Sequence, residues 1–575
     1  MINLKINDIP VSVPEGTTIL EAARTLGLKI PTLCHTKLDC MGVEHKSGSC
    51  RICVVEVEKR PTLAPSCCTP VTEGMVVKTN SQRAISARRT MLGLLLSNHP
   101  KDCLICAMNQ NCELQRLAHE FDVHEIKYQG EQHEFPIDVS SGAIRRDPTK
   151  CVMCRRCETA CNVVQTVGVL SGVNRGFDAT VAPENFKPLI ETSCTFCGQC
   201  VMACPVGALT EIGYKDEVWS AINDPSKHVV VQTAPSVRVA LGEEFNLPAG
   251  TITTGKMVAA LRRLGFAKVF DTNFSADLTI MEEGTELINR LKTGKNLPLL
   301  TSCCPGWVNF FEHQFPELLH MPSSAKSPQQ MFGSIAKSYY AEKMGLKPSD
   351  IVVVSIMPCL AKKYEAARPE FCHDGVKDVD FVLSTRELAS MIKEAGVMFA
   401  SLKDEDYDDP LGESTGASII FGASGGVLEA ALRTANDILT GEDIKEIDFV
   451  AIRGLEGIKE ATVTVAGQEL KVAVCSGLGN ARKLLTQIRD GKANYHVIEI
   501  MACPGGCING GGQPYTGSDL GTLEKRKEAI YEADRSFTLR KSHLNPSIQK
   551  LYKEYLGEPG SQLAHKLLHT RYFAK

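Results

Sequence analysis

Hydrophobic and polar residues alternate at the start of the chain. The segment 2–13, INLKINDIPVSV, shows this alternation on both sides of the Asn7-Asp8 dipeptide, which predicts two strands joined by a tight turn. In the following segment apolar residues recur at helical spacing, at Ile19, Ala22, Ala23 and Leu26. Either Thr17 or Thr18 can cap the start of this helix, and Gly27 can end it. The pattern therefore predicts a hairpin followed by a short helix.

A different pattern begins after residue 210, where runs of β-branched residues alternate with helical spacing. Four such runs are HVVVQTAPSVRVAL (228–241), KVFDTNFSADL (268–278), DIVVVSIMPCL (350–360) and YHVIEIMAC (495–503). Two of them end in a loop that carries a cysteine, and α/β folds gather functional residues at the ends of strands. We therefore expect an α/β domain over residues 211–575, with a site where these loops meet. The last ~35 residues mix apolar and basic positions, which predicts a helical tail.

Composition and charge exclude several classes of protein. With 575 residues, 43% of them hydrophobic and 23% charged, the chain is expected to form several packed domains. The net charge is −4 and no long run of one sign occurs, so neither nucleic acid nor an anionic membrane is an expected partner. The first residues lack a basic start followed by an apolar core, and no stretch of 18 apolar residues occurs. We expect a cytoplasmic protein.

Cysteine is the most informative residue type in the chain. There are 24 cysteines, most of them crowded into CxxC units. In a reducing compartment such units bind iron or zinc through thiolates rather than forming disulfides. Zinc also uses four-cysteine sites, but the run C-x2-C-x2-C-x3-C is typical of bacterial iron-sulfur ferredoxins. The pattern therefore favours iron-sulfur clusters.

Residues 1–79 present four cysteines in the order of a plant-type 2Fe-2S ferredoxin, namely Cys34, Cys50, Cys53 and Cys67. The predicted hairpin and helix suit the β-grasp fold of such a domain. The fourth ligand is ambiguous because Cys68 follows Cys67 directly and Cys40 lies within the first loop. The segment PSCCTPV resembles the ferredoxin arrangement of a small residue, Cys, any residue and Thr-Pro-Val, and on that resemblance we choose Cys67. Cys68 and Cys40 are then bystanders.

Residues 80–125 predict a small second cluster domain. Its potential ligands follow the spacing H-x3-C-x2-C-x5-C and are His99, Cys103, Cys106 and Cys112. A lone histidine is more often a surface or core residue, but an imidazole in place of one thiolate changes the charge and the potential of a cluster. The segment resembles the His-ligated 4Fe-4S site of the large iron-sulfur subunit of respiratory complex I, which implies that His99 is a ligand.

Two ferredoxin runs follow each other in residues 126–210, CVMCRRCETAC and CTFCGQCVMACP. Tandem runs of this kind hold two 4Fe-4S clusters that exchange their fourth ligands. One cluster is predicted on Cys151, Cys154, Cys157 and Cys204. The other is predicted on Cys194, Cys197, Cys200 and Cys161. A pair of zinc knuckles is the alternative, but zinc sites need no exchanged fourth cysteine.

Three glycine- and proline-rich segments in the second half carry five further cysteines. They are TSCCPGW (301–307), MPCLAKKYE (357–365) and EIMACPGGCINGGGQP (499–514). From the residues alone, they predict a thiolate-held iron cluster in a buried pocket. The glycines of 505–512 are expected to let the backbone approach such a cluster closely. The three segments resemble the active-site signatures of the iron-only (FeFe) hydrogenases, and at the level of motifs the resemblance extends over essentially the whole chain.

The resemblance implies an H-cluster, which is a 4Fe-4S unit joined to a diiron unit that carries carbon monoxide, cyanide and an azadithiolate. Its implied ligands are Cys304, Cys359, Cys503 and Cys507. Of these, Cys507 is expected to bridge the two units. Groups implied to surround the diiron unit are Lys362 and the backbone of Ala234, Pro235 and Ser236 toward the cyanides, with Met357, Met501 and Gln329 as further neighbours.

A proton path is also implied. Cys303, adjacent to a ligand, is predicted to be the last proton donor. Glu283, Glu286 and Arg290 fall at i, i+3 and i+7 of one predicted helix face. Taken alone, such a face is usually an exposed charged stripe, but the segment resembles the proton channel of the family, which Ser323 completes. Glu365 is expected to orient Lys362 or the local backbone.

We interpret the chain as a multidomain α/β iron-only hydrogenase that interconverts protons, electrons and molecular hydrogen. Three accessory 4Fe-4S clusters and one 2Fe-2S cluster are expected to relay electrons. The resemblance is greatest to catalytic subunits of NAD(P)-linked, electron-bifurcating hydrogenases and to the clostridial ferredoxin-type enzyme. No G-x-G-x-x-G fingerprint follows a strand, so any NAD(P) or flavin is expected on a partner subunit.

Other implied partners are ferredoxin and the proteins that mature the H-cluster. Three alternatives stay open. A stand-alone ferredoxin hydrogenase would use no NAD(P)-binding partner. A non-catalytic electron-transfer subunit would leave TSCCPGW and the glycine-rich segment unexplained. A sensory or iron-sulfur assembly homologue would keep the cysteines without fast turnover.

Overall fold

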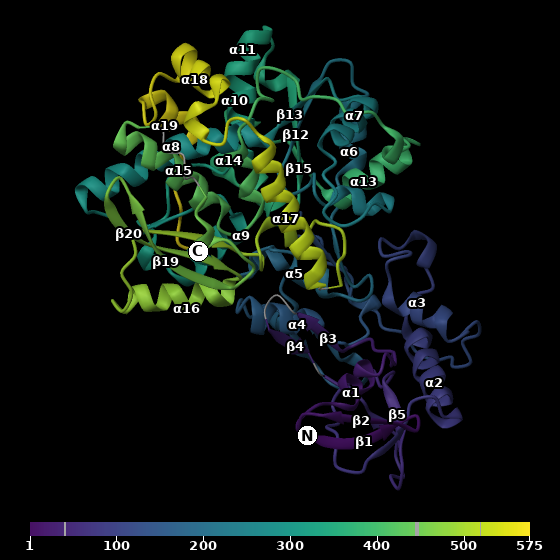
Figure 1. The fold of residues 1–575 in the computed structure, drawn as a ribbon. Helices are drawn as coiled ribbons and strands as arrows, with labels where there is room; N and C mark the ends of the chain where they lie inside the picture. The colour runs from purple at the N-terminus through teal and green to yellow at the C-terminus, as the bar shows by residue number, and fades with distance from the viewer. Residues whose placement is uncertain (39–41, 46, 443–447, 518) are drawn as a thin grey trace.

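The computed structural model describes residues 1–575 except 39–41, 46, 443–447 and 518 (Figure 1). Its N-terminal sheet has the strand order β2-β1-β7-β5-β6. The bounds of these strands are β1 Ile2–Ile6, β2 Ile9–Val13, β5 Val54–Val57, β6 Ala64–Pro65 and β7 Val76–Lys78. β1 and β2 are antiparallel, and the two residues between them, Asn7 and Asp8, have φ of 50° and 66°, the left-handed conformation of a tight hairpin turn. The predicted hairpin is confirmed.

The predicted helix is α1, Ile19–Thr25. Thr18 is its cap, because the Thr18 side chain accepts a hydrogen bond from the amide of Glu21 (3.2 Å). Thr17 instead donates its hydroxyl to the carbonyl of Pro14 (2.7 Å). Apolar side chains of the sheet and of α1 form a separate core, as a β-grasp arrangement requires.

Short helices and two-stranded sheets make up the next 130 residues. Their bounds are α2 Gln82–Asn98, α3 Glu113–Glu120, β8 Ile144–Arg146, α4 Arg156–Thr159, β9 Ser171–Val173, β10 Thr180–Ala182, α5 Gln199–Ala203 and β11 Leu209–Glu211. Most of the cysteines of this region are packed in one apolar cluster, together with Leu33 and Ile52 from the N-terminal domain. Leu360 and Ala361, which are distant in sequence, belong to the same cluster.

Two parallel sheets form the framework of the large domain. The first has the order β13-β12-β15-β18, with bounds Lys268–Asp271, His228–Thr233, Ile351–Met357 and Phe381–Ser384. The second has the order β14-β21-β20-β19, with bounds Leu299–Leu300, Val497–Met501, Gln468–Ser476 and Ile458–Val465; only β19 is antiparallel. All seven residues of β15 are buried, which is typical of a strand covered on both faces.

Helices fill the space between the two sheets and cover their outer faces. α8, Thr272–Thr293, contacts β12 of the first sheet, and α15, Gly426–Thr440, contacts β19 and β21 of the second. α8 and α15 also pack against each other, so these helices lie between the sheets (Figure 1). Further helices are α6 Lys215–Ile222, α7 Thr254–Leu264, α9 Pro305–Gln314, α10 Pro328–Ile335, α12 Ala361–Ala366, α13 Thr385–Glu394 and α16 Leu478–Arg489.

One of the predicted strand runs is shorter than its sequence pattern. In KVFDTNFSADL the strand ends at Asp271, because the Asp271 side chain accepts from the amide of Asn273 (3.1 Å) and caps α8. The C-terminal region is helical, as predicted. It comprises α17 Leu520–Ser536, α18 Pro546–Leu551 and α19 Gln562–Leu568, and α18 and α19 lie close to α8 and α10 (Figure 1).

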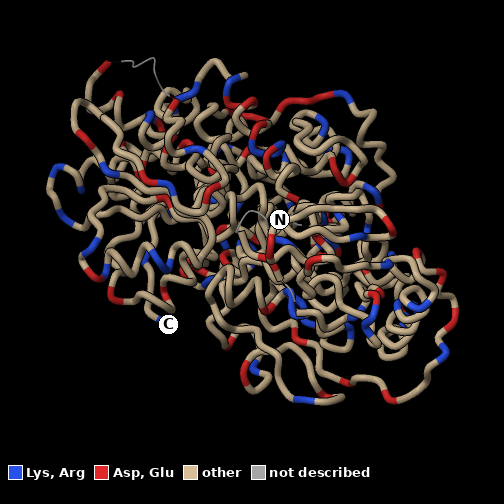
Figure 2. The backbone as a smooth tube through the Cα atoms, turned by 60° about the horizontal axis from the view of Figure 1, so that its bottom comes forward, with Lys and Arg blue, Asp and Glu red and all other residues tan. Residues whose placement is uncertain are grey.

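Lys and Arg positions are interspersed with Asp and Glu positions along the backbone (Figure 2). Among the helices that the structure describes, none combines the length and the apolar character needed to cross a lipid bilayer.

Candidate active site and metal centres

A cavity of about 80 Å³ lies at the carboxyl ends of the two parallel sheets. β12 and β15 reach it from the first sheet, whereas β21 and the loop after β14 reach it from the second. Its described lining is Ala234, Pro235, Ser236, Thr272, Cys303, Cys304, Pro305, Pro328, Gln329, Met357, Pro358, Cys359, Lys362, Phe421, Met501 and Cys507. These include every residue that the sequence assigned to the H-cluster and its diiron surroundings except Cys503. Cys503 is buried, and the thiols of Cys359 and Cys304 lie close enough to raise its pKa further.

The donor set of this cavity fits a thiolate-bound iron cluster. Burial raises the pKa of the thiols of Cys304, Cys359, Cys503 and Cys507. Iron binding would offset the cost of a buried thiolate, because the metal stabilises the deprotonated sulfur. Over the described part of the chain, no three His, Cys, Asp or Glu side chains converge on one point as the ligands of a single ion do. The thiols instead surround a volume, which is what a cluster of several irons requires.

Lys362 lines the cavity and is held by a buried carboxylate. Its Nζ donates to Glu365 Oε2 (2.9 Å) and to the carbonyl of Cys303 (3.0 Å). Burial disfavours the ammonium, but Glu365 and the nearby thiols more than offset this, so the pKa of Lys362 is raised. Glu365 also accepts from Gln329 Nε2 (3.0 Å) and Ser327 Oγ (3.0 Å). Glu365 therefore orients Lys362, as expected, and fixes Gln329 as well.

Cys303 and Glu283 lie at the inner end of the predicted proton path. Glu283 is buried on α8, and neither of its carboxyl oxygens has a hydrogen-bond partner among the described residues. Burial and the nearby Glu286 raise the pKa of Glu283 to about 8. Burial and the neighbouring Glu283 raise the pKa of the Cys303 thiol well above its ordinary value. Both groups therefore hold a proton near neutral pH, which is the state that a proton donor needs.

Glu286 and Arg290 lie at the outer end. Glu286 Oε2 accepts from Ser323 Oγ (3.0 Å) and from the amide of Ser324 (3.0 Å). Glu286 Oε1 accepts from Arg290 Nη2 (2.5 Å), and Arg290 also donates to three backbone carbonyls. The predicted helix face thus exists in α8 and is covered by the segment around Ser323 instead of facing water.

Close packing against neighbouring backbone requires glycine at two positions of the glycine-rich segment. A Cβ on Gly510 would lie 2.2 Å from the carbonyl oxygen of Pro358, and one on Gly511 would lie 2.7 Å from the Cα of Gly198. Neighbouring protein backbone is therefore enough to exclude side chains at these two positions. Gly511 lets the loop after Cys507 pack against the loop that carries Cys197, and the expected approach to a cluster stays a prediction.

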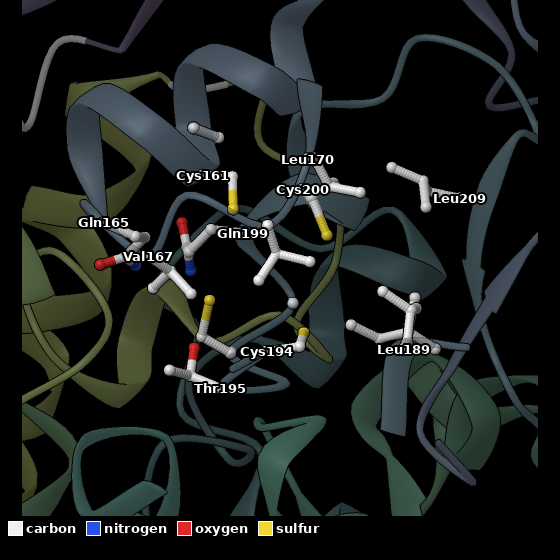
Figure 3. Close-up of a pocket in the computed structure, with 15 residues that line it drawn as sticks. Cys161, Gln165, Val167, Leu170, Leu189, Cys194, Thr195, Gln199, Cys200 and Leu209 are labelled. Atoms are coloured by element: carbon white, nitrogen blue, oxygen red, sulfur yellow. The ribbon is translucent and has the colours of Figure 1, made fainter. Parts of the chain in front are cut away.

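A second cavity, of about 30 Å³, lies in the ferredoxin-like region. Its lining includes Cys161, Cys194, Cys197 and Cys200. Figure 3 shows Cys161 and Cys200 on one side of this space and Cys194 on another. Cys161 comes from the first cysteine run and the other three from the second run. The structure thus brings together the four residues of one predicted exchanged set.

The other predicted set, Cys151, Cys154, Cys157 and Cys204, lies in the same apolar cluster. Burial raises the pKa of Cys154 and of Cys157, and the neighbouring Cys204 raises both further. Cys204 therefore lies close to the first run, although it is the last cysteine of the second.

Four buried cysteines gather in the N-terminal domain. The Cys34 thiol is in hydrogen-bonding contact with the thiols of Cys50 and Cys67. Cys53 Sγ lies 3.4 Å from Cys67 Sγ. Cys68 is exposed, and its Sγ lies 3.3 Å from Cys67 Sγ. Cys40 lies outside the described residues.

Because Cys67 is buried among the other three thiols and Cys68 faces the surface, we expect Cys68→Ser to leave the 2Fe-2S signal unchanged. Cys67→Ser should remove this signal or shift it. The measurement is electron paramagnetic resonance of the reduced protein, with iron content determined in parallel. If Cys68→Ser removed the signal and Cys67→Ser did not, the assignment would be reversed.

His99 directly follows α2 and is half-buried. Burial and the nearby Lys150 lower the pKa of His99, which favours the neutral imidazole that binds metals. Burial raises the pKa of Cys112, and the thiols of Cys106 and Cys103 lie close enough to raise it further. The side chains of the two residues between Cys103 and Cys106 are 90% and 86% exposed, so this group of predicted ligands lies near the surface.

Some lining residues were missed by sequence reasoning. Pro305, Pro328 and Pro358 each adjoin a predicted residue, and that adjacency was an available signal. Thr272 and Phe421 come from segments without any motif, so only the tertiary structure brings them to the cavity.

Residues 227–511 match the description "iron only hydrogenase large subunit, C-terminal domain", and residues 521–575 match "iron hydrogenase small subunit". Residues 1–82 match a 2Fe-2S iron-sulfur cluster binding domain, residues 88–127 match the NADH-ubiquinone oxidoreductase-G iron-sulfur binding region, and residues 188–210 match a 4Fe-4S binding domain. The chain belongs to the iron-only hydrogenase family, and it is an iron hydrogenase, an oxidoreductase.

The chain is similar over its whole length to the NADP-reducing hydrogenase subunit HndD of Solidesulfovibrio fructosivorans, with 58% identity over 100% of this chain and 99% of that protein. It is 42% identical to iron hydrogenase 1 of Clostridium pasteurianum, over 99% of both chains. A solved structure of a variant of the [FeFe]-hydrogenase HydA1 from Chlamydomonas reinhardtii matches with a TM-score of 0.58 and 43% identity, over 63% of this chain and 99% of that one. The predicted family and multidomain α/β fold are confirmed.

Proposed function

We propose that this chain is the hydrogen-converting subunit of an NADP-linked hydrogenase complex, and that the cavity between the two parallel sheets holds its H-cluster. One observation carries the proposal. Thiols, the ammonium of Lys362 and the soft side chains of Met357 and Met501 line one cavity at the strand ends. The similarity over the full length to an NADP-reducing hydrogenase subunit supports the link to NADP.

In this proposal Cys304, Cys359, Cys503 and Cys507 hold the cluster, which supplies redox and hydrogen-binding chemistry when bound. Lys362 offers an ammonium to an anionic ligand of the iron. The two methionines and Pro358 exclude water from the cavity. Cys303 holds the last proton, and Glu283 is the buried group that renews it.

The accessory sites are proposed to relay electrons. Their ligand sets are those predicted from the cysteine spacing. The mutual burial of Cys161 with the second run supports the exchanged arrangement. The cysteine-rich region also contacts the catalytic domain beside a proposed ligand, because Gln165 Nε2 donates to the carbonyl of Ala502 (2.9 Å), the residue before Cys503. This contact supports a short last step of electron transfer to the proposed H-cluster. A flavin- and NADP-binding partner subunit is then the expected electron acceptor.

Infrared spectroscopy of anaerobically matured protein tests the H-cluster. We expect stretching bands of carbon monoxide and cyanide, and their absence from a protein that is loaded with iron would refute the proposal.

Anaerobic purification from the native host tests the complex. A stoichiometric flavoprotein would support the NADP link, whereas an active isolated chain that reacts with ferredoxin would show a stand-alone enzyme.

Replacing Gly511 by alanine is expected to slow electron delivery several-fold, because a Cβ there would lie 2.7 Å from Gly198 Cα and 2.8 Å from the carbonyl oxygen of Cys197. The two cluster-bearing loops must then separate, and electron tunnelling weakens steeply with distance. The measurement compares dye-linked hydrogen oxidation with isotope exchange between deuterium gas and water, which needs no external electrons. The rate of dye-linked hydrogen oxidation should fall, and the rate of isotope exchange should not. Gly521→Ala in α17 is the control, since its Cβ would meet nothing closer than 3.6 Å. An equal loss of both reactions would contradict the expectation.

A further inference from the structure

The C-terminal segment closes over the outer end of the proton path. Lys326 N donates to Leu568 O (2.7 Å) and Thr570 N donates to Ser324 O (2.8 Å), so backbone hydrogen bonds fix the chain on both sides of His569. The His569 side chain is mostly buried and keeps 8% of its surface exposed. It therefore lies between solvent and the interior, in a fixed position.

His569 joins Ser324 to a buried carboxylate. Its Nδ1 lies 2.9 Å from Ser324 Oγ, and its Nε2 lies 2.9 Å from Glu282 Oε2. Glu282 also accepts from the hydroxyl of Tyr552 (2.5 Å) and from the amide of Gly560 (2.8 Å). Because Glu282 acts as an acceptor throughout, Nε2 of His569 donates to it and Nδ1 faces the serine hydroxyl. A carboxylate in this place orients the imidazole and fixes which of its nitrogens carries the proton.

Ser324 connects this pair with the proton path. Its Oγ donates to Glu286 Oε2 (3.2 Å), the same oxygen that accepts from Ser323 Oγ (3.0 Å). A hydrogen-bonded line therefore runs from His569 through Ser324 to Glu286. Arg290, the other group at this end, carries a guanidinium, which keeps its proton in proteins and cannot pass one on. Imidazole is the side chain suited to proton exchange near neutral pH.

We propose that His569 is the group that exchanges protons between solvent and Glu286, with Ser324 as the intermediate hydroxyl and Glu282 as the orienting carboxylate. This inference rests on the function proposed for the path from Glu286 to Cys303.

The transfer moves protons only. The Nδ1–H bond of protonated His569 breaks as Ser324 gains that proton, and the proton already on Ser324 passes to Glu286. Neutral His569 then takes a proton from water, and hydrogen oxidation runs the same steps in reverse. The titratable groups that face His569 are Glu282 on α8, with Tyr552 on its far side, and His565 on α19, whose ring centroid lies 4.1 Å from that of His569.

The first test is the pH dependence of hydrogen production by matured His569→Gln protein with a saturating electron donor. We expect a several-fold lower kcat, an unchanged KM for the donor, and partial recovery when imidazole is added to the buffer. His565→Gln is the matched control, because His565 lies on α19 four residues before His569 and the structure gives it no hydrogen bond to Ser324. The proposal is overturned by a wild-type kcat and pH profile in His569→Gln, or by a loss that imidazole does not restore.

The second test does not depend on hydrogen chemistry. In purified full-length protein labelled with ¹⁵N-histidine, the two ring resonances that are absent from His569→Gln report which nitrogen carries the proton. Replacing the carboxylate in Glu282→Gln should reduce the share of the Nε2-protonated tautomer, because an amide is a weaker acceptor than a carboxylate. An unchanged tautomer balance would overturn the proposed role of Glu282. If this test succeeds while the wild-type protein shows no hydrogen turnover, the proposed function fails and the relay geometry stands.

Discussion

Alanine in place of Cys303 is expected to lower hydrogen turnover by about 10²–10⁴-fold, the usual contribution of a positioned acid or base. The Cys303 thiol borders the cavity next to the proposed ligand Cys304, and burial keeps its pKa high, so it stays protonated and is placed to donate to the proposed cluster. Infrared bands of carbon monoxide and cyanide should remain, because the variant keeps all four proposed cluster ligands. The measurement pairs the infrared spectrum with hydrogen evolution from a reduced dye.

Cys372→Ala provides the control for this result. Cys372 is half-buried in the short strand Cys372–His373 (β16), away from the cavity lining, and its loss should leave turnover unchanged. Near-normal turnover in Cys303→Ala would show that protons arrive by another route. Loss of the infrared bands would show instead that Cys303 is needed to bind the cluster.

Glutamine in place of Glu283 should cause a comparable loss of turnover and, unlike Cys303→Ala, a gain in stability. Glutamine keeps the size of the side chain but cannot release a proton. The wild-type carboxyl is uncharged in its buried site below its pKa of about 8 and takes a charge above it. Its contribution to stability is therefore full below the ordinary carboxyl range and is lost as the pH rises through 8.

The stability gain has a defined pH dependence. Relative to wild type, Glu283→Gln should gain about 1.4 kcal/mol for each pH unit between the ordinary carboxyl range and 8, and no more above it. Thermal unfolding at pH 5, 7 and 9 measures this difference. Glu558→Gln, at an exposed position, is the control and should show no such trend. A difference that is constant with pH would mean that Glu283 is not buried as a neutral acid.

The sequence predicted those features that depend on spacing along the chain. Cysteine intervals predicted that Cys161 lies with the second run, as the structure shows. The 3.6-residue period placed Glu283, Glu286 and Arg290 on one face of α8. The hairpin at Asn7-Asp8 needed only local turn chemistry. These features are short-range, so one sequence suffices to predict them.

Features that depend on tertiary contact could not be predicted in this way. Ser324 and His569 are 245 residues apart, and no spacing rule pairs them. The exclusion of a side chain at Gly511 depends on Gly198, which lies in another domain. The strand in KVFDTNFSADL ends early because Asp271 caps a helix, an outcome that β-branched content does not reveal. In each case the deciding partner is distant in sequence or competes with a local pattern.

The apolar cluster that joins the cysteine-rich region to Leu360 and Ala361 has a consequence for the cooperativity of the molecule. These two residues follow the proposed ligand Cys359 and pack among the thiols of the accessory sites. The regions before and after residue 210 are therefore expected to unfold together, although the sequence pattern changes at that point. Calorimetry should show the accessory and catalytic regions melting in one transition. A shortened chain that starts at residue 211 would expose this apolar face to water and would need polar substitutions there to stay monomeric.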